Sequence, residues 1–217
     1  MHPDEPELNA AMGRYSTGDD SAFATLYRLL HPRLRSYFLR MRGRAGHADD
    51  LVQETFLRIH RARAMFGRGA SALPWVYAIG RNVLIDHTRY TRLRDARTVP
   101  EEQAPEPPDT GADVESAAVA SEAARAVERA LSRLPEIQRE AFVLVRYEGL
   151  SIKDAAAALG TTQAAVKLRA FRAYEAIRAE LAAPSGPAIE DNPRGGEKPA
   201  APSAVGGKET PVRARQK

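Results

Sequence analysis

The stretch SIKDAAAALGTTQAAVKLRAF, residues 151–171, decides the fold of this chain. Ser151 is followed three residues later by Asp154, a pair that resembles a capping box at the start of a helix. Gly160 stands where that short helix would end, because the tight turn after a helix favours a residue that adopts a positive φ. These three residues predict a short helix followed by a tight turn.

A second helix is expected after the turn, capped by Thr161 or Thr162. The spacing of Ala156, Gly160 and Val166 is typical of a helix-turn-helix: a small residue lets the helices cross closely, and an apolar residue packs back from the second helix. Two ordinary amphipathic helices separated by a glycine would give a similar pattern. The agreement of capping, turn and crossing residues favours the helix-turn-helix.

The expected second helix has one apolar stripe and one polar end. Its buried stripe is predicted to be Val166, Ala170, Ala173, Ile177 and Leu181. Gln163, Ala164 and Lys167 lie at its N-terminal end, the part of a recognition helix that enters the major groove of DNA. A Gln side chain can pair with adenine, and Lys or Arg with guanine or phosphate.

Helical spacing of apolar residues dominates the rest of the chain as well. It predicts helices at 23–30, 34–41, 48–63, 75–94 and 136–148. Pro32 is expected to break the first two apart, and 64–73 to be a loop. The last helix would support the helix-turn-helix through Ile137, Ala141, Leu144 and Val145. The alternation typical of strands is absent from the sequence, so the expected fold class is all-α.

Composition excludes several classes of protein. The chain has 217 residues, no cysteine and a net charge of +4. Disulfide frameworks, thiolate metal sites and cysteine nucleophiles are therefore excluded. The sequence holds no run of about 18 apolar residues, and its N-terminus is acidic, so neither a membrane span nor a secretory signal is expected. The five histidines show no metal-like spacing, and phosphate loops and nucleophile elbows are lacking, so we expect no enzyme, no cofactor and no metal.

Charge and proline divide the chain into segments. Residues 98–115 contain six acidic residues, four prolines and no basic residue, a composition that favours a flexible linker. Residues after 183 are rich in proline and glycine. We therefore predict two small helical domains at 1–96 and 117–183, a flexible linker at 97–116 and a disordered tail at 184–217.

The chain resembles bacterial RNA polymerase sigma factors in three stretches: ADDLVQETF at 48–56, WVYAIGRNVLIDHTRY at 75–90, and LPEIQREAFVLVRYEGLSIKDAAAALGTTQAAVKLRAFRA at 134–173. It is most similar to the extracytoplasmic-function (ECF) type, which has regions 2 and 4 only. The resemblance implies a transcription initiation factor that binds core RNA polymerase, recognises the −10 and −35 promoter elements and promotes DNA melting. A stand-alone helix-turn-helix regulator is the alternative.

The resemblance also implies roles for the first domain. Asp50, Gln53, Glu54 and Phe56 would dock on the clamp coiled coil of the polymerase β′ subunit, although Glu54 could instead pair with Arg58 one turn away. The residues implied in reading the non-template strand of the −10 element are Trp75, Asn82, Arg89, Arg92 and Arg94. Trp75 could equally be a core anchor, and the arginines are expected to contact phosphates.

In the second domain, the resemblance implies recognition of duplex −35 DNA through Thr162, Gln163, Ala164, Lys167, Arg169 and Arg172. An apolar face of the same domain would bind the flap of the β subunit. The sequence departs from the family at Leu168, Ala170 and the run from Asp154 to Ala156. An anti-sigma factor is an expected further partner, and the cytoplasm is the expected location.

Overall fold

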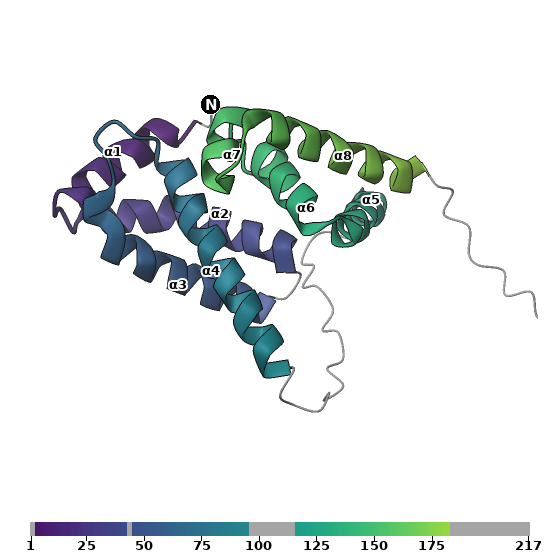
Figure 1. Cartoon of the computed structure of the whole chain (residues 1–217), viewed down its shortest axis with the longest axis horizontal. Coiled ribbons are helices and arrows are strands. Elements are labelled where there is room, and N and C mark those ends of the chain that lie inside the picture. The colour runs from purple at the N-terminus through teal and green to yellow at the C-terminus, as the bar shows by residue number, and fades with distance from the viewer. Residues whose placement is uncertain (1–2, 43–44, 96–115, 183–217) are drawn as a thin grey trace, which may run out of the picture. The chain divides into compact units, whose positions relative to one another are not determined.

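The structure is a computed structural model that describes residues 3–42, 45–95 and 116–182. The expected linker, apart from Ser116, and the whole expected tail lie outside these residues. Within the described residues every regular element is helical, which confirms the all-α prediction (Figure 1). No helix in this part of the chain is both long enough and apolar enough to cross a membrane.

Four α-helices and one short 3₁₀ turn form the N-terminal half of the described chain. Their bounds are α1 Glu5–Ser16, α2 Ala22–Arg42, α3 Ala45–Ala62, η1 Arg63–Met65 and α4 Ala72–Asp95. Helix α1 was not among the predicted helices, although Leu8, Met12 and Tyr15 recur at helical spacing and are buried.

The predicted break at Pro32 is wrong, because α2 runs without interruption through it. A proline inside a helix removes one backbone hydrogen bond and costs about 3 kcal/mol in isolation. Here Leu30 and Leu34, on either side of Pro32, are both buried in the same core. A single continuous helix keeps both leucines in that core, and this burial offsets the lost hydrogen bond.

The C-terminal half contains α5 Ser116–Arg133, α6 Glu136–Phe142, a π-helical turn η2 Val143–Tyr147, α7 Ile152–Leu159 and α8 Gln163–Ala182. The predicted helix at 136–148 therefore exists but changes its hydrogen-bond pattern at Val143. Two predicted burials fail: Ile137 is 53% exposed and Leu181 is 47% exposed. Both lie near the start or end of their helix, where solvent competes with packing.

The helix-turn-helix has the predicted caps. The Asp154 amide donates to Ser151 Oγ at 3.1 Å, and the Ser151 hydroxyl donates to Asp154 Oδ2 at 2.6 Å. Gly160 ends α7 with φ of +59°. Thr162 caps α8, since its Oγ1 accepts from the Ala165 amide at 3.1 Å. The local signals in residues 151–171 are therefore confirmed.

One apolar cluster runs through α1–α4 and continues into α6, η2 and α7. Tyr37 and Tyr77 lie in it, fully buried, with ring centroids 5.4 Å apart. α4 packs directly against α7, the helix that precedes the recognition helix. A second, smaller cluster joins α5 to α8 through Leu131, Leu134 and Ile177. The N-terminal and C-terminal helices thus share a core.

Candidate nucleic-acid interface

The start of α4 is fixed by residues far away in sequence. The Ala72 amide donates to Asn9 Oδ1 of α1 at 2.8 Å, which satisfies one of the free amides of the first helical turn. The indole of Trp75 is half-buried and meets the buried Phe66 ring edge-on, with centroids 5.4 Å apart. Trp75 is therefore partly a core anchor, and its position holds the loop between Phe66 and α4.

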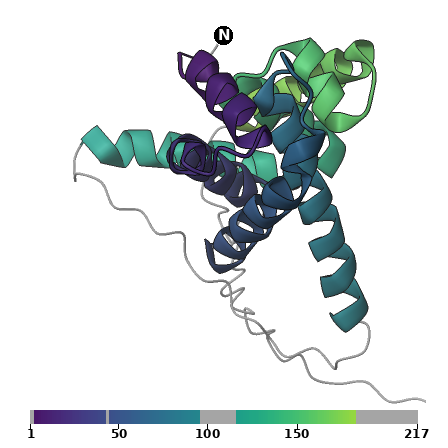
Figure 2. The same ribbon diagram turned by 90° about the vertical axis from the view of Figure 1, so that its left-hand side faces the viewer.

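Beyond Trp75, one face of α4 is open to solvent. Asn82 and Arg89 lie seven residues apart, so they share this face, and both are exposed. Arg92 and Arg94 are exposed in the last turn. Figure 2 shows the C-terminal half of α4 projecting beyond the helices that pack on its first half. Its exposed cations can reach an extended polyanion without a conformational change.

The α3 residues implied in polymerase binding differ in their availability. Asp50 and Gln53 are exposed, but Glu54 accepts from Arg58 Nε at 2.8 Å. The same guanidinium reaches Asp86 of α4 at 2.7 Å, and both hydrogen bonds raise the pKa of Arg58. Glu54 therefore helps to join α3 to α4. Phe56 is only 6% exposed, so most of its ring is packed inside the protein.

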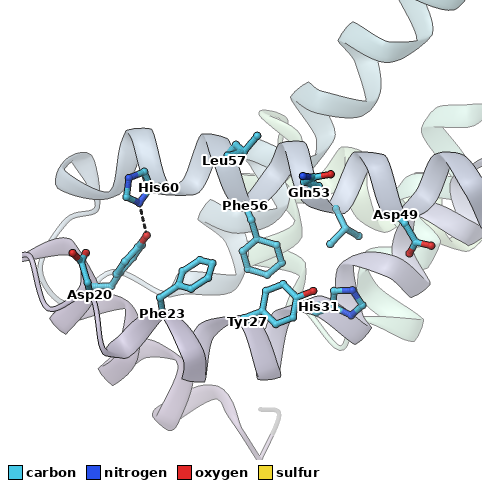
Figure 3. Close-up of a pocket in the computed structure, with 11 residues that line it drawn as sticks. Asp20, Phe23, Tyr27, His31, Asp49, Gln53, Phe56, Leu57 and His60 are labelled. Carbon is cyan, nitrogen blue, oxygen red and sulfur yellow. Dashed lines mark hydrogen bonds between the residues drawn. The ribbon is translucent and has the colours of Figure 1, made fainter.

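An open groove of about 670 Å³ lies between α2 and α3 (Figure 3). Phe23, Tyr27, Phe56 and Leu57 give it apolar walls, and Tyr27 and Leu57 are substantially exposed. Its polar lining comes from Asp20, Asp49, Gln53 and two histidines. At one end the Tyr15 hydroxyl lies 2.6 Å from His60 Nδ1. No local sequence pattern points to this groove, because its walls come from two separate helices.

The N-terminal end of α8 presents most of its predicted DNA-reading side chains. Thr162, Gln163, Ala164, Lys167 and Arg172 are exposed, whereas Arg169 is half-buried. Leu168 and Phe171 are also exposed on this helix, and the sequence analysis assigned neither to DNA. The first three turns of α8 contain no acidic residue, so these turns carry no charge of their own that would repel a phosphate backbone.

Two buried carboxyl groups stand apart from these exposed surfaces. Burial raises the pKa of Glu140 above its ordinary value, against the opposing effects of Arg81 and the Tyr37 hydroxyl. Burial also raises the pKa of Glu148, where Tyr77 opposes the shift. Across the described residues, no cluster of histidine and acidic side chains could hold a metal ion.

Comparison with known proteins identifies the family. A family model described as Sigma-70 region 2 matches residues 26–94, and one described as Sigma-70, region 4 matches residues 124–177. The ECF RNA polymerase sigma factor SigF of Caulobacter vibrioides is 36% identical over 183 residues, covering 82% of this chain and 95% of SigF. The chain belongs to the ECF sigma factors.

Further relatives agree with this assignment. The ECF sigma factor SigM of Mycobacterium tuberculosis is 37% identical over 179 residues, covering 82% of this chain and 83% of SigM. The sigma factor RpoE of Bartonella quintana, solved with the anti-sigma factor NepR, matches with a TM-score of 0.60 and 26% identity over 73% of this chain and 96% of RpoE. CnrH, solved with the cytosolic domain of CnrY, matches with a TM-score of 0.61 and 25% identity over 82% of this chain and 99% of CnrH.

Membership of the ECF sigma factors makes this chain a transcription initiation factor of bacterial RNA polymerase that recognises promoters. The relatives favour this function over a stand-alone helix-turn-helix regulator. The two family models fall on α2–α4 and on α5–α8, so the exposed faces of α4 and α8 belong to the two matched regions.

Proposed function

We propose that this ECF sigma factor binds promoters through two exposed helix faces and docks on polymerase through the α2–α3 groove. The observation that carries the proposal is the exposed face of α4, where Asn82 and Arg89 lie two helical turns apart and the half-buried Trp75 lies two turns before Asn82. An amide that can read a base, followed further along the same helix by exposed cations, suits an extended nucleic-acid strand.

At the −10 element, Asn82 would hydrogen-bond the edge of an unpaired base, and Arg89, Arg92 and Arg94 would contact phosphates. Melted DNA offers unstacked bases, and holding one outside the duplex costs a few kcal/mol that specific contacts must offset. The Trp75 ring would support this binding indirectly, by fixing the loop before α4 through its contact with Phe66.

At the −35 element, the N-terminal end of α8 would enter the major groove. Gln163 and Lys167 are exposed there and supply the hydrogen-bonding groups that distinguish base pairs. Ala164 leaves room for a close approach, and Arg172 and the half-buried Arg169 would contact phosphates. Thr162 caps the helix, so its role is to fix the first turn against the DNA.

Polymerase docking is assigned to the groove between α2 and α3 and to its rim. Apolar walls with an acidic rim fit an amphipathic helical partner that carries basic residues, such as the β′ clamp coiled coil. Gln53, which lines the groove, and Asp50, which lies on the side of α3 that faces α4, would make the polar contacts. Glu54 and Phe56 would act mainly by holding α3 in place, because Glu54 is paired and Phe56 is buried.

The same chain is proposed to meet an anti-sigma factor, since the solved relatives RpoE and CnrH are in complexes with NepR and CnrY. We place its action in the cytoplasm with the polymerase, without catalysis of its own, and with an apolar face of residues 117–183 on the β flap. Residues 97–116 are proposed to be the linker between the two DNA-binding regions.

Run-off transcription with core polymerase tests the proposal. We expect sequence-selective initiation only when the protein is present, across a library of promoter sequences. Transcription equal to that of core polymerase alone would refute it. Tight binding to a palindromic duplex without polymerase would instead support the stand-alone regulator.

A further inference from the structure

The outward face of α8 is apolar at its centre over the first turns of the helix. Val166, Ala173 and Ile177 are buried and define the side of α8 that packs on the protein. At about 100° per residue, Leu168 and Phe171 lie roughly 160° and 140° from Val166, in opposite directions around the helix axis. Leu168 is 50% exposed and Phe171 is 61% exposed. Two large apolar side chains therefore stand on the face opposite the core.

Positive charges flank this apolar pair on both sides. Lys167 and Arg172 are exposed, and they lie roughly 100° and 120° from Val166 in opposite directions. Ala164, one turn before the pair, is exposed and adds no polar side chain. The first acidic residue of α8 is Glu175, which follows the pair. The first turns of α8 thus combine an apolar centre with a cation on each flank.

This pattern suits the major groove of duplex DNA better than the surface of a protein. Phosphates line both walls of a groove about 12 Å wide, so a helix lying in it meets anions on its two flanks and base edges along its centre. An apolar protein partner would need separate acidic groups on two sides to match Lys167 and Arg172. Charge complementarity therefore favours DNA as the occupant of this face.

One apolar group is available on the base edges of the major groove. It is the C5-methyl group of thymine, whereas the other groups displayed there donate or accept hydrogen bonds. Leu168 and Phe171 are three residues apart, about 4.5 Å along the helix axis. Successive bases of one strand are about 3.4 Å apart. The two side chains can therefore contact methyl groups on two nearby base steps.

We propose that Leu168 and Phe171 read thymine in the −35 element, each through van der Waals contact with a C5-methyl group. Gln163 and Lys167 supply hydrogen bonds beside them, and Arg172 contacts a phosphate. The inference rests on the proposed function and adds a base preference to it. The sequence departs from the family at Leu168, so this preference is a property of this chain.

Replacement of single bases tests the proposal in the holoenzyme. Preferred promoters are first selected from a library with a randomised −35 region, and we expect thymines on two nearby steps. Each thymine is then replaced by deoxyuridine, which keeps every hydrogen-bonding group and removes only the methyl. The loss of one methyl contact should weaken promoter binding about fourfold. A selected −35 element without thymine, or equal binding of thymine and uracil, would overturn the proposal.

Two variants of the full chain assign the methyl contacts. Leu168→Ala should abolish the effect of uracil at one thymine, and Phe171→Ala at the other, with an unchanged helical content because alanine favours helices. Leu181→Ala is the matched control. Leu181 is similarly exposed on the same helix but lies about 20 Å further along its axis, so this variant should keep both effects. Full uracil effects in Leu168→Ala and Phe171→Ala would overturn the methyl contacts.

Binding to core polymerase without DNA separates the remaining outcomes. Weaker binding of Leu168→Ala to the enzyme, with both uracil effects intact, would assign the apolar pair to a protein contact and overturn the proposal. A holoenzyme that selects no −35 sequence and does not initiate would instead refute the proposed function.

Discussion

The side-chain oxygen of Asn9 accepts a 2.8 Å hydrogen bond from the backbone amide of Ala72, so α1 caps the first turn of α4 across 63 residues of sequence. Asn9→Ala should lower the free energy of unfolding by about 1 kcal/mol, the usual loss for a capping side chain. Urea denaturation measures this change in the free energy of unfolding. Asn82→Ala is the matched control, because Asn82 is exposed, and an equal loss in both variants would contradict the capping role.

The same pair of variants separates stability from promoter melting. Asn82→Ala should reduce open-complex formation about tenfold or more while leaving holoenzyme assembly nearly unchanged, because a lost base contact costs about 1–3 kcal/mol. Permanganate footprinting and a polymerase-binding assay measure the two steps. Equal losses in both steps would show that Asn82 is structural.

Asp50→Arg should weaken binding to core polymerase about tenfold, because it reverses an exposed charge of α3 on the side of that helix that faces α4. Glu54→Gln should have a smaller effect, since Glu54 is already paired with Arg58. Fluorescence anisotropy of the labelled protein measures both. Glu128→Arg on α5 is the control for a charge reversal, and an affinity unchanged by Asp50→Arg would exclude this docking surface.

Gly160→Ala should destabilise the protein by about 1 kcal/mol and weaken −35 recognition, because φ of +59° strains a residue with a Cβ atom. Gly13→Ala in α1 is the opposite control: the added Cβ meets no atom within 4 Å, φ is helical, and the variant should be neutral or more stable. Thermal unfolding compares the stabilities of the Gly160→Ala and Gly13→Ala variants. A neutral Gly160→Ala variant would contradict the turn geometry.

Glu140 predicts a pH dependence of stability. Its pKa is raised by burial, so the native state binds more protons than the unfolded chain between the ordinary value of 4.5 and the raised value. The stabilisation from this group is complete below 4.5 and is lost as the pH rises through the raised pKa. Relative to Glu140→Gln, the native protein should therefore gain stability as the pH falls through the raised pKa toward 4.5. A constant difference between their urea midpoints would contradict this.

Local chemistry made part of the structure predictable. Ser151, Gly160 and Thr162 act on their own neighbours within a few residues, so the sequence alone predicts the helix-turn-helix. Pro32 misled the analysis because the core that keeps α2 continuous comes from residues distant in sequence. Burial also depends on residues distant in sequence. Ile137 and Leu181 follow the helical period of apolar residues, but no neighbouring helix covers them fully.

The candidate site was likewise only partly predictable from the sequence. Asn82 and Arg89 share a face because they lie seven residues apart, and both residues are exposed. The pairing of Glu54 with Arg58 was one of two alternatives that the sequence left open. The second hydrogen bond of Arg58, to Asp86, could not be predicted, because it depends on the packing of α3 on α4. The bond from Tyr37 to Glu140 spans 103 residues, beyond any local pattern.

The shared core has a practical consequence for dissecting the molecule. A fragment that ends after α4 would leave the Tyr37 and Tyr77 hydroxyls without their acceptors and would bring parts of two aromatic rings into water. Exposed aromatic surface promotes self-association. Such a truncated piece should precipitate or oligomerise unless these tyrosines are replaced by hydrophilic side chains.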